Sequence, residues 1–310
     1  MFHQELKKTM VKNMKLLRTP DERFENLPKF SYNPNYIDLD GIRIHYLDEG
    51  PRSTECVLLM HGEPSWCFLY RHMIPVLINA GYRILAPDLV GFGRSDKPTE
   101  ESDHTYQKHV EWIAEWVKLL KLRNITLFCQ DWGSLIGLRV AIENQDRFSR
   151  IVLSNGGLPT GEQRMSDAFL KWRDFSRNSP IFDIKTIIQG GTTTQLSDDI
   201  LKGYDAPFPD DTFKAGARIM PSLVPIGKDD PEHEANKNAI ERFRRWNKPF
   251  LTAFSDSDPI TRGGERFWQK IVPGSQGQNH NTIKGAGHFV QEDKGAELAE
   301  LIVEFIKNNP

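Results

Sequence analysis

The sequence predicts an α/β fold in which a mostly parallel, eight-stranded sheet is flanked by helices and carries an inserted helical cap. Short apolar runs of strand length recur along the chain and are separated by segments with helical periodicity. One long interval near the middle has no convincing strand pattern. At 310 residues and 38% hydrophobic content, the chain is long enough to bury a large core.

The first strands are predicted around an Asp-Gly pair. Residues 36–46 alternate apolar and polar side chains about Asp40-Gly41, which is the strongest short signal for a β-hairpin. Later runs are continuous and apolar, as expected for strands buried on both faces. These predicted strands cover residues 57–60, 83–86, 125–129, 151–154, 249–254 and 280–283.

Helices are predicted between these strands. The segment 105–120 places its apolar residues on one helical face, and similar patterns begin at Gly133 and cover the last residues of the chain. Strands alternating with helices favour parallel pairing with right-handed crossovers. The interval 158–228 holds short helical patterns broken by Gly and Pro, so we expect core residues 1–157, a helical cap at 158–228, and core residues 229–310.

Composition limits the classes of partner. The 40 basic and 42 acidic residues leave a net charge of −2 without a basic stripe, so we expect no nucleic acid. No segment approaches the ~20 apolar residues of a membrane span, and we expect no membrane partner. Three cysteines without a paired motif indicate reduced thiols, hence a cytoplasmic protein, which we expect to be a monomer. Residues 1–13 are a candidate loosely attached extension.

Asp131 stands at the most informative position in the chain. It lies between the predicted strand 125–129 and the helical pattern that opens at Gly133. A sharp strand-to-helix turn at this point is a nucleophile elbow, which presents one side chain above the sheet beside backbone donors. Here that side chain is a carboxylate, although an Asp that only caps the helix would give the same local pattern.

Two further segments supply the partners that such a nucleophile needs. Asp256 and Asp258 follow one predicted strand, and His288 follows the last one. Nucleophile, acid and histidine in this chain order are the order of the α/β-hydrolase triad, and His61-Gly62 is placed to form an oxyanion loop. A lone loop histidine is more often structural, but three members in order are hard to explain by chance.

Six stretches carry a resemblance to haloalkane dehalogenases of the α/β-hydrolase superfamily, from about residue 16 to the end. The most specific is the Asp-Trp pair that follows a Gln. One departure is Cys129, where the superfamily elbow usually has Gly, and another is Ser134, where similar proteins carry Gly. The matching stretches are 18–24 (RTPDERF), 45–50 (HYLDEG), 61–66 (HGEPSW), 91–98 (GFGRSDKP), 130–133 (QDWG) and 287–292 (GHFVQE).

The resemblance implies hydrolysis of a carbon–halogen bond to an alcohol, a halide ion and a proton, without a cofactor or metal. The partners would be a small halogenated alkane and the halide. The residue chemistry agrees, because an ionised Asp131 can displace halide directly and form an alkyl ester. His288 would then activate water, with Asp258, favoured over Asp256 by spacing and by the family match, fixing its tautomer.

Other residues complete the predicted site. The backbone N–H groups of Glu63 and Trp132 are placed to receive the oxyanion, and indole N–H groups of Trp132 and Trp172 would bind halide. Trp172, in the cap, could instead be a core anchor of its helix. Candidates for an apolar pocket wall are Phe128, Phe169, Phe175, Phe208, Pro209 and Leu223.

Three alternatives stay open. An epoxide hydrolase would share the nucleophile and histidine but needs cap tyrosines, and this cap offers Tyr204 alone. A fluoroacetate-type dehalogenase needs arginines beside the nucleophile, where this chain has Trp132. A noncatalytic small-molecule sensor on the same fold would not need an intact nucleophile, acid and base.

Overall fold

The computed structural model describes residues 14–52 and 55–310, so the predicted extension 1–13 lies outside the described residues. Its main sheet has eight strands in the order β10-β9-β8-β7-β4-β5-β3-β2. Pairing is antiparallel at β2–β3 and β3–β5 and parallel elsewhere, which confirms the predicted mostly parallel sheet. The strands are β2 (Asn35–Leu39), β3 (Ile42–Glu49), β4 (Cys56–Met60), β5 (Arg83–Pro87), β7 (Ile125–Cys129), β8 (Phe148–Leu153), β9 (Phe250–Ser255) and β10 (Asn281–Ile283).

The hairpin at the start of the sheet forms where the Asp-Gly pair predicts it. Asp40 and Gly41 have φ angles of 55° and 101°. Positive φ at both central residues is what a two-residue turn between twisted strands requires. The register pairs Leu39 with Ile42, so the alternating apolar residues face the core together.

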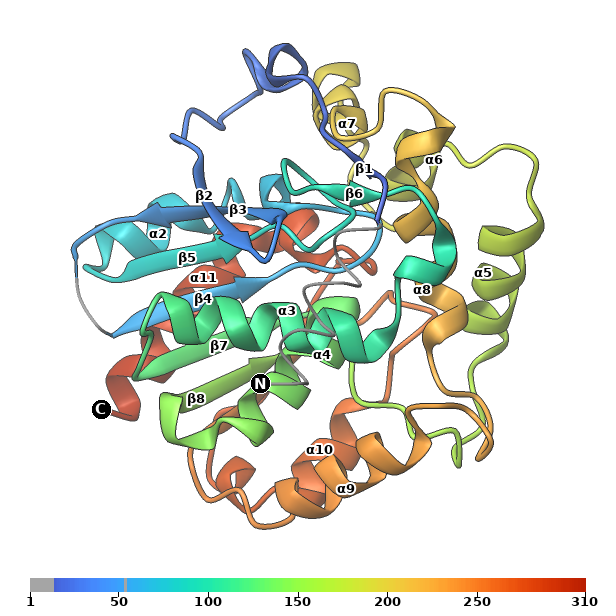
Figure 1. Cartoon of the computed structure of the whole chain (residues 1–310). Helices are drawn as coiled ribbons and strands as arrows, with labels where there is room; N and C mark the ends of the chain where they lie inside the picture. Colours follow the sequence, from blue (N-terminus) through green and yellow to red (C-terminus); the bar gives the residue numbers. More distant parts are fainter. Residues whose placement is uncertain (1–13, 53–54) are drawn as a thin grey trace.

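Helices cover both faces of the sheet. Figure 1 shows α3 (Tyr106–Leu119) and α4 (Trp132–Glu143) in front of the strands, with α2 (Ile74–Asn79) and α11 (Val290–Asn308) behind them. Helix α3 begins after Thr105, whose side chain accepts a hydrogen bond from the backbone N–H of Lys108, an N-cap that satisfies one free donor. Helices α9 (His233–Phe243) and α10 (Glu265–Ile271) follow the cap in sequence.

The interval predicted as a cap is helical. It contains α5 (Asp167–Asn178), α6 (Ile184–Gly190), α7 (Asp198–Asp205) and α8 (Ala215–Leu223), and Figure 1 shows them grouped beyond one end of the sheet. No strand is assigned within residues 158–228, all of which the structure describes. The limits of the three segments remain a prediction.

Helix α7 of the cap is hydrogen-bonded to a buried ion pair of the core. Arg71 donates to Glu292 at 2.7 Å through one of its amino groups, and both side chains are almost completely buried. Tyr204 of α7 donates its hydroxyl to the same carboxylate. The indole of Trp66 adds a bond of 3.0 Å to the carbonyl oxygen of Gly203. Helix α7 is therefore held to the core by both charged and neutral hydrogen bonds.

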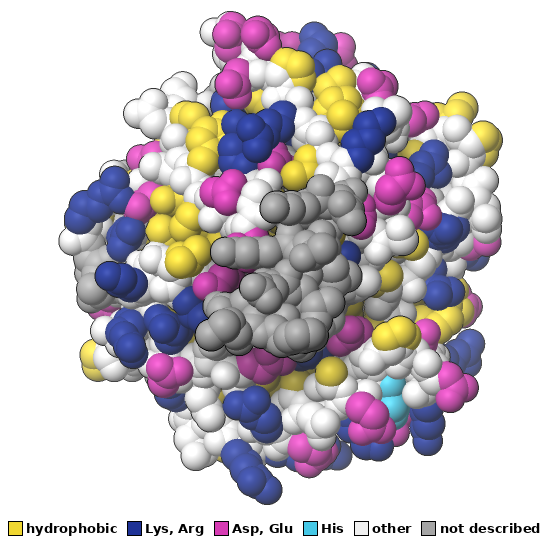
Figure 2. Space-filling view, viewed as in Figure 1, with side chains coloured by type: hydrophobic (Ala, Val, Ile, Leu, Met, Phe, Trp, Pro, Cys, Tyr) yellow, Lys and Arg dark blue, Asp and Glu magenta, His cyan; other side chains and the backbone are white. Residues whose placement is uncertain are grey.

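One small element is absent from the sequence prediction. Strand β1 (Leu16–Leu17) pairs antiparallel with β6 (Lys97–Pro98), which makes a separate two-stranded sheet. All three cysteines are buried and unpaired. Among the described residues, no helix has the length and hydropathy needed to cross a membrane. Figure 2 shows basic and acidic side chains interspersed over the visible face.

Candidate active site

Asp131 occupies a strained turn between β7 and α4. Its φ of 50° lies in the left-handed region that an aspartate rarely adopts. This conformation costs free energy, and the close packing around the turn must offset that cost. The turn is tight because a Cβ on Gly133 would approach the carbonyl oxygen of Met60 to 1.9 Å. The backbone N–H of Asp131 donates to the carbonyl oxygen of Asn155 at 3.0 Å. The elbow is thus closed by a glycine and by a bond to the loop after β8.

The loop that follows β4 meets the carboxyl group of Asp131. The backbone N–H of Glu63 donates to Oδ1 of Asp131 at 2.8 Å. The chain can come this close because Gly62 has no side chain, since a Cβ there would lie 2.2 Å from the same oxygen. Trp132 is the first residue of α4, so its N–H belongs to the free donors at the helix N-terminus. The Glu63 donor therefore contacts the carboxylate directly, whereas the Trp132 donor stays a prediction from its place at the start of α4.

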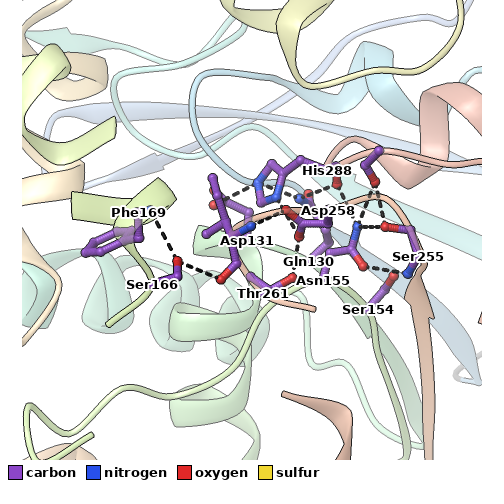
Figure 3. Close-up of polar contacts among 12 residues, drawn as sticks. Gln130, Asp131, Ser154, Asn155, Ser166, Phe169, Ser255, Asp258, Thr261 and His288 are labelled. Atoms are coloured by element: carbon purple, nitrogen blue, oxygen red, sulfur yellow. Dashed lines mark hydrogen bonds and ion pairs between the residues drawn. The ribbon is translucent and has the colours of Figure 1, made fainter. Parts of the chain in front are cut away.

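His288 lies between two carboxylates. Its Nε2 is 3.3 Å from Oδ2 of Asp131 and its Nδ1 is 3.0 Å from Oδ2 of Asp258 (Figure 3). Asp258 is fixed in turn by Thr261 and by the N–H of Ile260, which donates at 2.9 Å. Asp256 instead accepts from the N–H of Gly285 at 2.9 Å. The structure thus brings Asp131, His288 and Asp258 together and turns Asp256 to the neighbouring loop.

Charge and burial have opposite effects on the pKa of His288. Burial lowers the pKa of His288, but the attraction of Asp258 and of Asp131 outweighs it and raises the pKa to about 10. For Asp258, burial favours the neutral acid, yet His288 and the hydrogen bonds of Thr261 and Ile260 bring its pKa down to about 2. Asp258 is therefore ionised at neutral pH, and Nδ1 of His288 carries a proton toward it.

Glu63 adds a further carboxyl group beside Asp131. It is 3% exposed, and its Oε1 has no hydrogen-bond partner among the described residues. Burial first, and then the charge of Asp131, raise the pKa of Glu63 well above its usual range. The Trp172 side chain acts weakly in the opposite direction and lowers this pKa. The carboxyl group of Glu63 thus favours its neutral, protonated form beside an ionised Asp131.

A cavity of about 1110 Å³ opens above Asp131. Its wall includes both predicted halide donors, Trp132 from the elbow and Trp172 from α5 of the cap. Of the six apolar wall candidates, the structure places Phe169 on this wall. Phe128 lies in the buried core of β7, and Phe175 is 41% exposed on α5, so the sequence did not identify the wall correctly. Helix packing, which the sequence pattern does not specify, decides which side chains reach the cavity.

Known proteins resemble this arrangement over nearly the whole chain. Residues 55–295 match the model of the alpha/beta hydrolase fold family. A haloalkane dehalogenase of Psychrobacter cryohalolentis is 54% identical over 96% of this chain and 100% of its own length. A second, from Mycolicibacterium paratuberculosis, is 50% identical over 94% and 98% of the two chains. This chain belongs to the haloalkane dehalogenase family.

Solved structures of the family share the fold. The tetrameric haloalkane dehalogenase DpaA from Paraglaciecola agarilytica superposes with a TM-score of 0.85 at 35% identity, covering 93% of this chain and 97% of that one. The haloalkane dehalogenase DatA from Agrobacterium tumefaciens, at 23% identity and a TM-score of 0.77, is similar in fold, covering 94% and 100% of the two chains.

Two side-chain amides donate hydrogen bonds to His288, and the sequence did not predict either contact. Asn155 donates through Nδ2 to the carbonyl oxygen of His288 at 3.0 Å, and Gln130 donates through Nε2 to the same oxygen at 3.1 Å. Gln130 was visible as part of the Gln-Asp-Trp motif, but only the folded chain shows that it turns toward the histidine. Asn155 follows the apolar run of β8 without any distinguishing pattern.

Within the described part of this dehalogenase chain, the buried residues His45, Cys67 and Asp88 have spacings that could hold a metal ion. The carboxylate of Asp88 already accepts bonds from His45 Nδ1 at 2.7 Å, from the N–H of Cys67 at 2.9 Å and from the N–H of Arg94 at 2.8 Å. These contacts use its lone pairs within the protein, so the donor set does not fit a resident metal.

Proposed function

We propose that this chain hydrolyses haloalkanes to an alcohol, a halide ion and a proton through an alkyl ester on Asp131. The observation that carries the proposal is the cavity wall shared by Asp131, Trp132 and Trp172 above the His288–Asp258 pair. A carboxylate nucleophile, two indole rings and a paired histidine suit displacement of halide from a saturated carbon.

In the first step, Oδ2 of Asp131 attacks the halogen-bearing carbon while Oδ1 stays on the N–H of Glu63. A carbon–oxygen bond forms, the carbon–halogen bond breaks, and the halide leaves with both electrons. The indole N–H groups of Trp132 and Trp172 receive it, because indole donates a hydrogen bond and does not titrate in the working range.

In the second step, His288 takes a proton from water, and the oxygen of that water attacks Cγ of the ester. The oxyanion forms on Asp131 beside the Glu63 donor, and the loss of one such donor typically costs ~3 kcal/mol. Collapse of this intermediate breaks the bond between Cγ and the alkyl-bearing oxygen, and the departing alkoxide takes the proton of the added hydroxyl, which releases the alcohol and returns the carboxylate. The proton leaves His288 for solvent, which balances the reaction.

The charge of Asp131 decides when His288 can act as a base. In the resting site two carboxylates hold the ring protonated, since together they raise the pKa of His288 to about 10 despite burial. The ester carries no charge, so the attraction from Asp131 disappears and the ring can lose its proton. Formation of the intermediate therefore prepares the base for the next step.

The alternatives fit less well. Tyr204, the tyrosine that an epoxide hydrolase would use, is fully buried and donates to Glu292 away from the cavity wall. The residue beside the nucleophile is Trp132 and not an arginine. A sensor without turnover would have no use for a His288 that is paired on one side with the nucleophile and on the other with an acid.

Loss of the nucleophile tests the proposal. Asp131→Ala should abolish halide release from 1-bromobutane and 1,2-dibromoethane, while Asp256→Ala, which alters the carboxylate that faces Gly285, should keep it. Halide release by Asp131→Ala at the wild-type rate would refute this nucleophile. A panel with one epoxide and fluoroacetate separates the alternative activities.

Oligomeric state and location are separate proposals. We propose a monomer, although the DpaA relative is described as tetrameric, and sedimentation velocity would decide between the two. We also propose a cytoplasmic location on the ground of three buried, unpaired cysteines. Fractionation of cells that express the chain would test that location.

A further inference from the structure

Gln130, which immediately precedes the nucleophile, has no role in the two chemical steps described above. It is fully buried, and Figure 3 shows its side chain beside the His288 ring. Its Nε2 lies 3.2 Å from Nε2 of His288 and 3.1 Å from the carbonyl oxygen of the same residue. The ring nitrogen that must accept a proton from water is thus in direct contact with this amide.

The orientation of the amide is fixed by its other partners. A backbone carbonyl oxygen only accepts hydrogen bonds, so the atom 3.1 Å from it must be the NH₂ group of Gln130. The amide oxygen of Gln130 accepts from Nε2 of Gln291 at 3.3 Å. The carbonyl contact fixes the assignment and the Gln291 contact agrees with it, so the amide directs an N–H, and not an oxygen, toward the ring.

Two neighbours of Nε2 then favour opposite protonation states. The carboxylate of Asp131, at 3.3 Å, attracts a protonated Nε2. The N–H of Gln130 is satisfied only when Nε2 offers its lone pair. Since Asp258 holds the proton on Nδ1, the ring cannot present the other tautomer to the amide without losing that ion pair.

We propose that Gln130 is a positioning residue for the base: once Asp131 is esterified, its amide donates to Nε2 of His288 and stabilises the unprotonated ring. The inference rests on the proposed two-step function. In the resting site the charge of Asp131 dominates and the ring is an imidazolium. In the ester the charge is gone and the amide remains, so Gln130 favours the base at the stage that needs it.

The other charged groups facing His288 do not change this sequence of states. Asp258 contacts Nδ1 in both stages, and its attraction for the ring is therefore common to them. Glu63, from the loop after β4, contributes an attraction to the ring when it is ionised, but its own burial favours the neutral acid. Esterification of Asp131 also removes one cause of the raised pKa of Glu63, but burial, the larger cause, remains. The loss of the Asp131 charge is therefore the main change at Nε2.

The pH dependence of ester hydrolysis tests the proposal. Gln130→Met keeps the length of the side chain and removes the donor, so the acidic midpoint of single-turnover ester hydrolysis should rise by about one pH unit, the equivalent of one neutral hydrogen bond. The burst of halide from ester formation should change little, because that step needs no base. An unmoved midpoint would overturn the proposal.

Gln291→Met is the matched control. It removes the amide that donates to Gln130 but leaves the carbonyl oxygen of His288 to orient Gln130. The midpoint should therefore shift less than in Gln130→Met. Equal shifts in both variants would indicate repacking beneath the ring and would also overturn the proposal.

A titration that needs no turnover tests the role of Gln130 even if a variant is too slow for kinetics. Asp131→Asn removes the charge of the nucleophile as esterification does, and NMR titration of His288 in that background reports the protonation of the ring directly. Addition of Gln130→Met should raise the His288 midpoint by about one unit there too. If His288→Phe forms no alkyl ester, the proposed function fails; if the ester forms and the midpoint is unmoved, only the role of Gln130 fails.

Discussion

One carboxyl oxygen of Asp131 is fixed 2.8 Å from the backbone nitrogen of Glu63. That contact assigns different tasks to the two oxygens of the nucleophile. In the proposed mechanism, the oxygen on the Glu63 donor becomes the oxyanion when water attacks the ester, and the other, which faces Nε2 of His288 at 3.3 Å, attacks the alkyl carbon. A rigid glycine-containing loop supplies the donor, so the arrangement exists before substrate binds.

Removal of the base should separate the two steps. His288→Phe leaves Asp131 ionised and able to displace halide, but no group remains to activate water. The variant should release about one equivalent of halide per active site and then stop. Mass spectrometry of the protein after incubation with 1-bromobutane should find an added butyl group on Asp131, and an unmodified protein would contradict the ester.

The acid that supports His288 can be distinguished from its neighbour. Asp258→Asn removes the charge that holds the proton on Nδ1, and steady-state turnover should fall at least about a hundredfold, as in other triads. Asp256→Asn changes a carboxylate of the same loop that accepts from Gly285, so turnover should stay near that of the parent protein. Equal losses in the two variants would count against the assignment of Asp258.

The cap indole should contribute to halide affinity. Trp172→Phe keeps an aromatic ring on the cavity wall and removes one N–H donor, so bromide should bind roughly tenfold more weakly, the loss expected for one hydrogen bond to an ion. Quenching of the remaining tryptophan fluorescence by bromide measures the change. Trp112→Phe on α3, outside the cavity wall, serves as the control, and the proposal fails if both variants bind bromide alike.

Glu63 should make stability fall with increasing pH. Burial and the charge of Asp131 raise its pKa above the ordinary 4.5, so the folded chain binds this proton more tightly than the unfolded chain. The stabilisation is complete below pH 4.5 and is lost as pH rises toward the raised value. Glu63→Gln lacks this dependence, and its melting temperature relative to wild type should increase between pH 5 and pH 8. Glu300→Gln, at an exposed position of α11, should show no such trend.

Much of the fold was predictable because buried parallel strands are continuous apolar runs. The run 125–129 coincides with β7, and the Asp-Gly pair places the first hairpin. The pairing of Leu16–Leu17 with Lys97–Pro98 was missed, since strands of two residues have no periodicity and depend on distant chain segments. The wall of the cavity was also mispredicted, because the rotation of α5 against the core decides which aromatic residues face inward.

The proximity of Asp131 and His288 followed from topology. Residues after parallel strands gather at one edge of a sheet, so chain order alone brings nucleophile, acid and histidine near each other. The amide contacts of Gln130 and Asn155 to His288 did not follow, because they depend on side-chain directions at the ends of β7 and β8. The local sequence does not determine these side-chain directions.

The attachment of the cap constrains how molecules enter and leave. Swinging α7 away from the core as a rigid lid would take Tyr204 from the Arg71–Glu292 pair and bring water to two sealed charges. Loss of the hydrogen bond from Tyr204 to this charged carboxylate costs about 1.5–3 kcal/mol. We therefore expect alkane, alcohol and halide to enter and leave the cavity with α7 in place, so that the width of its opening limits which molecules are turned over.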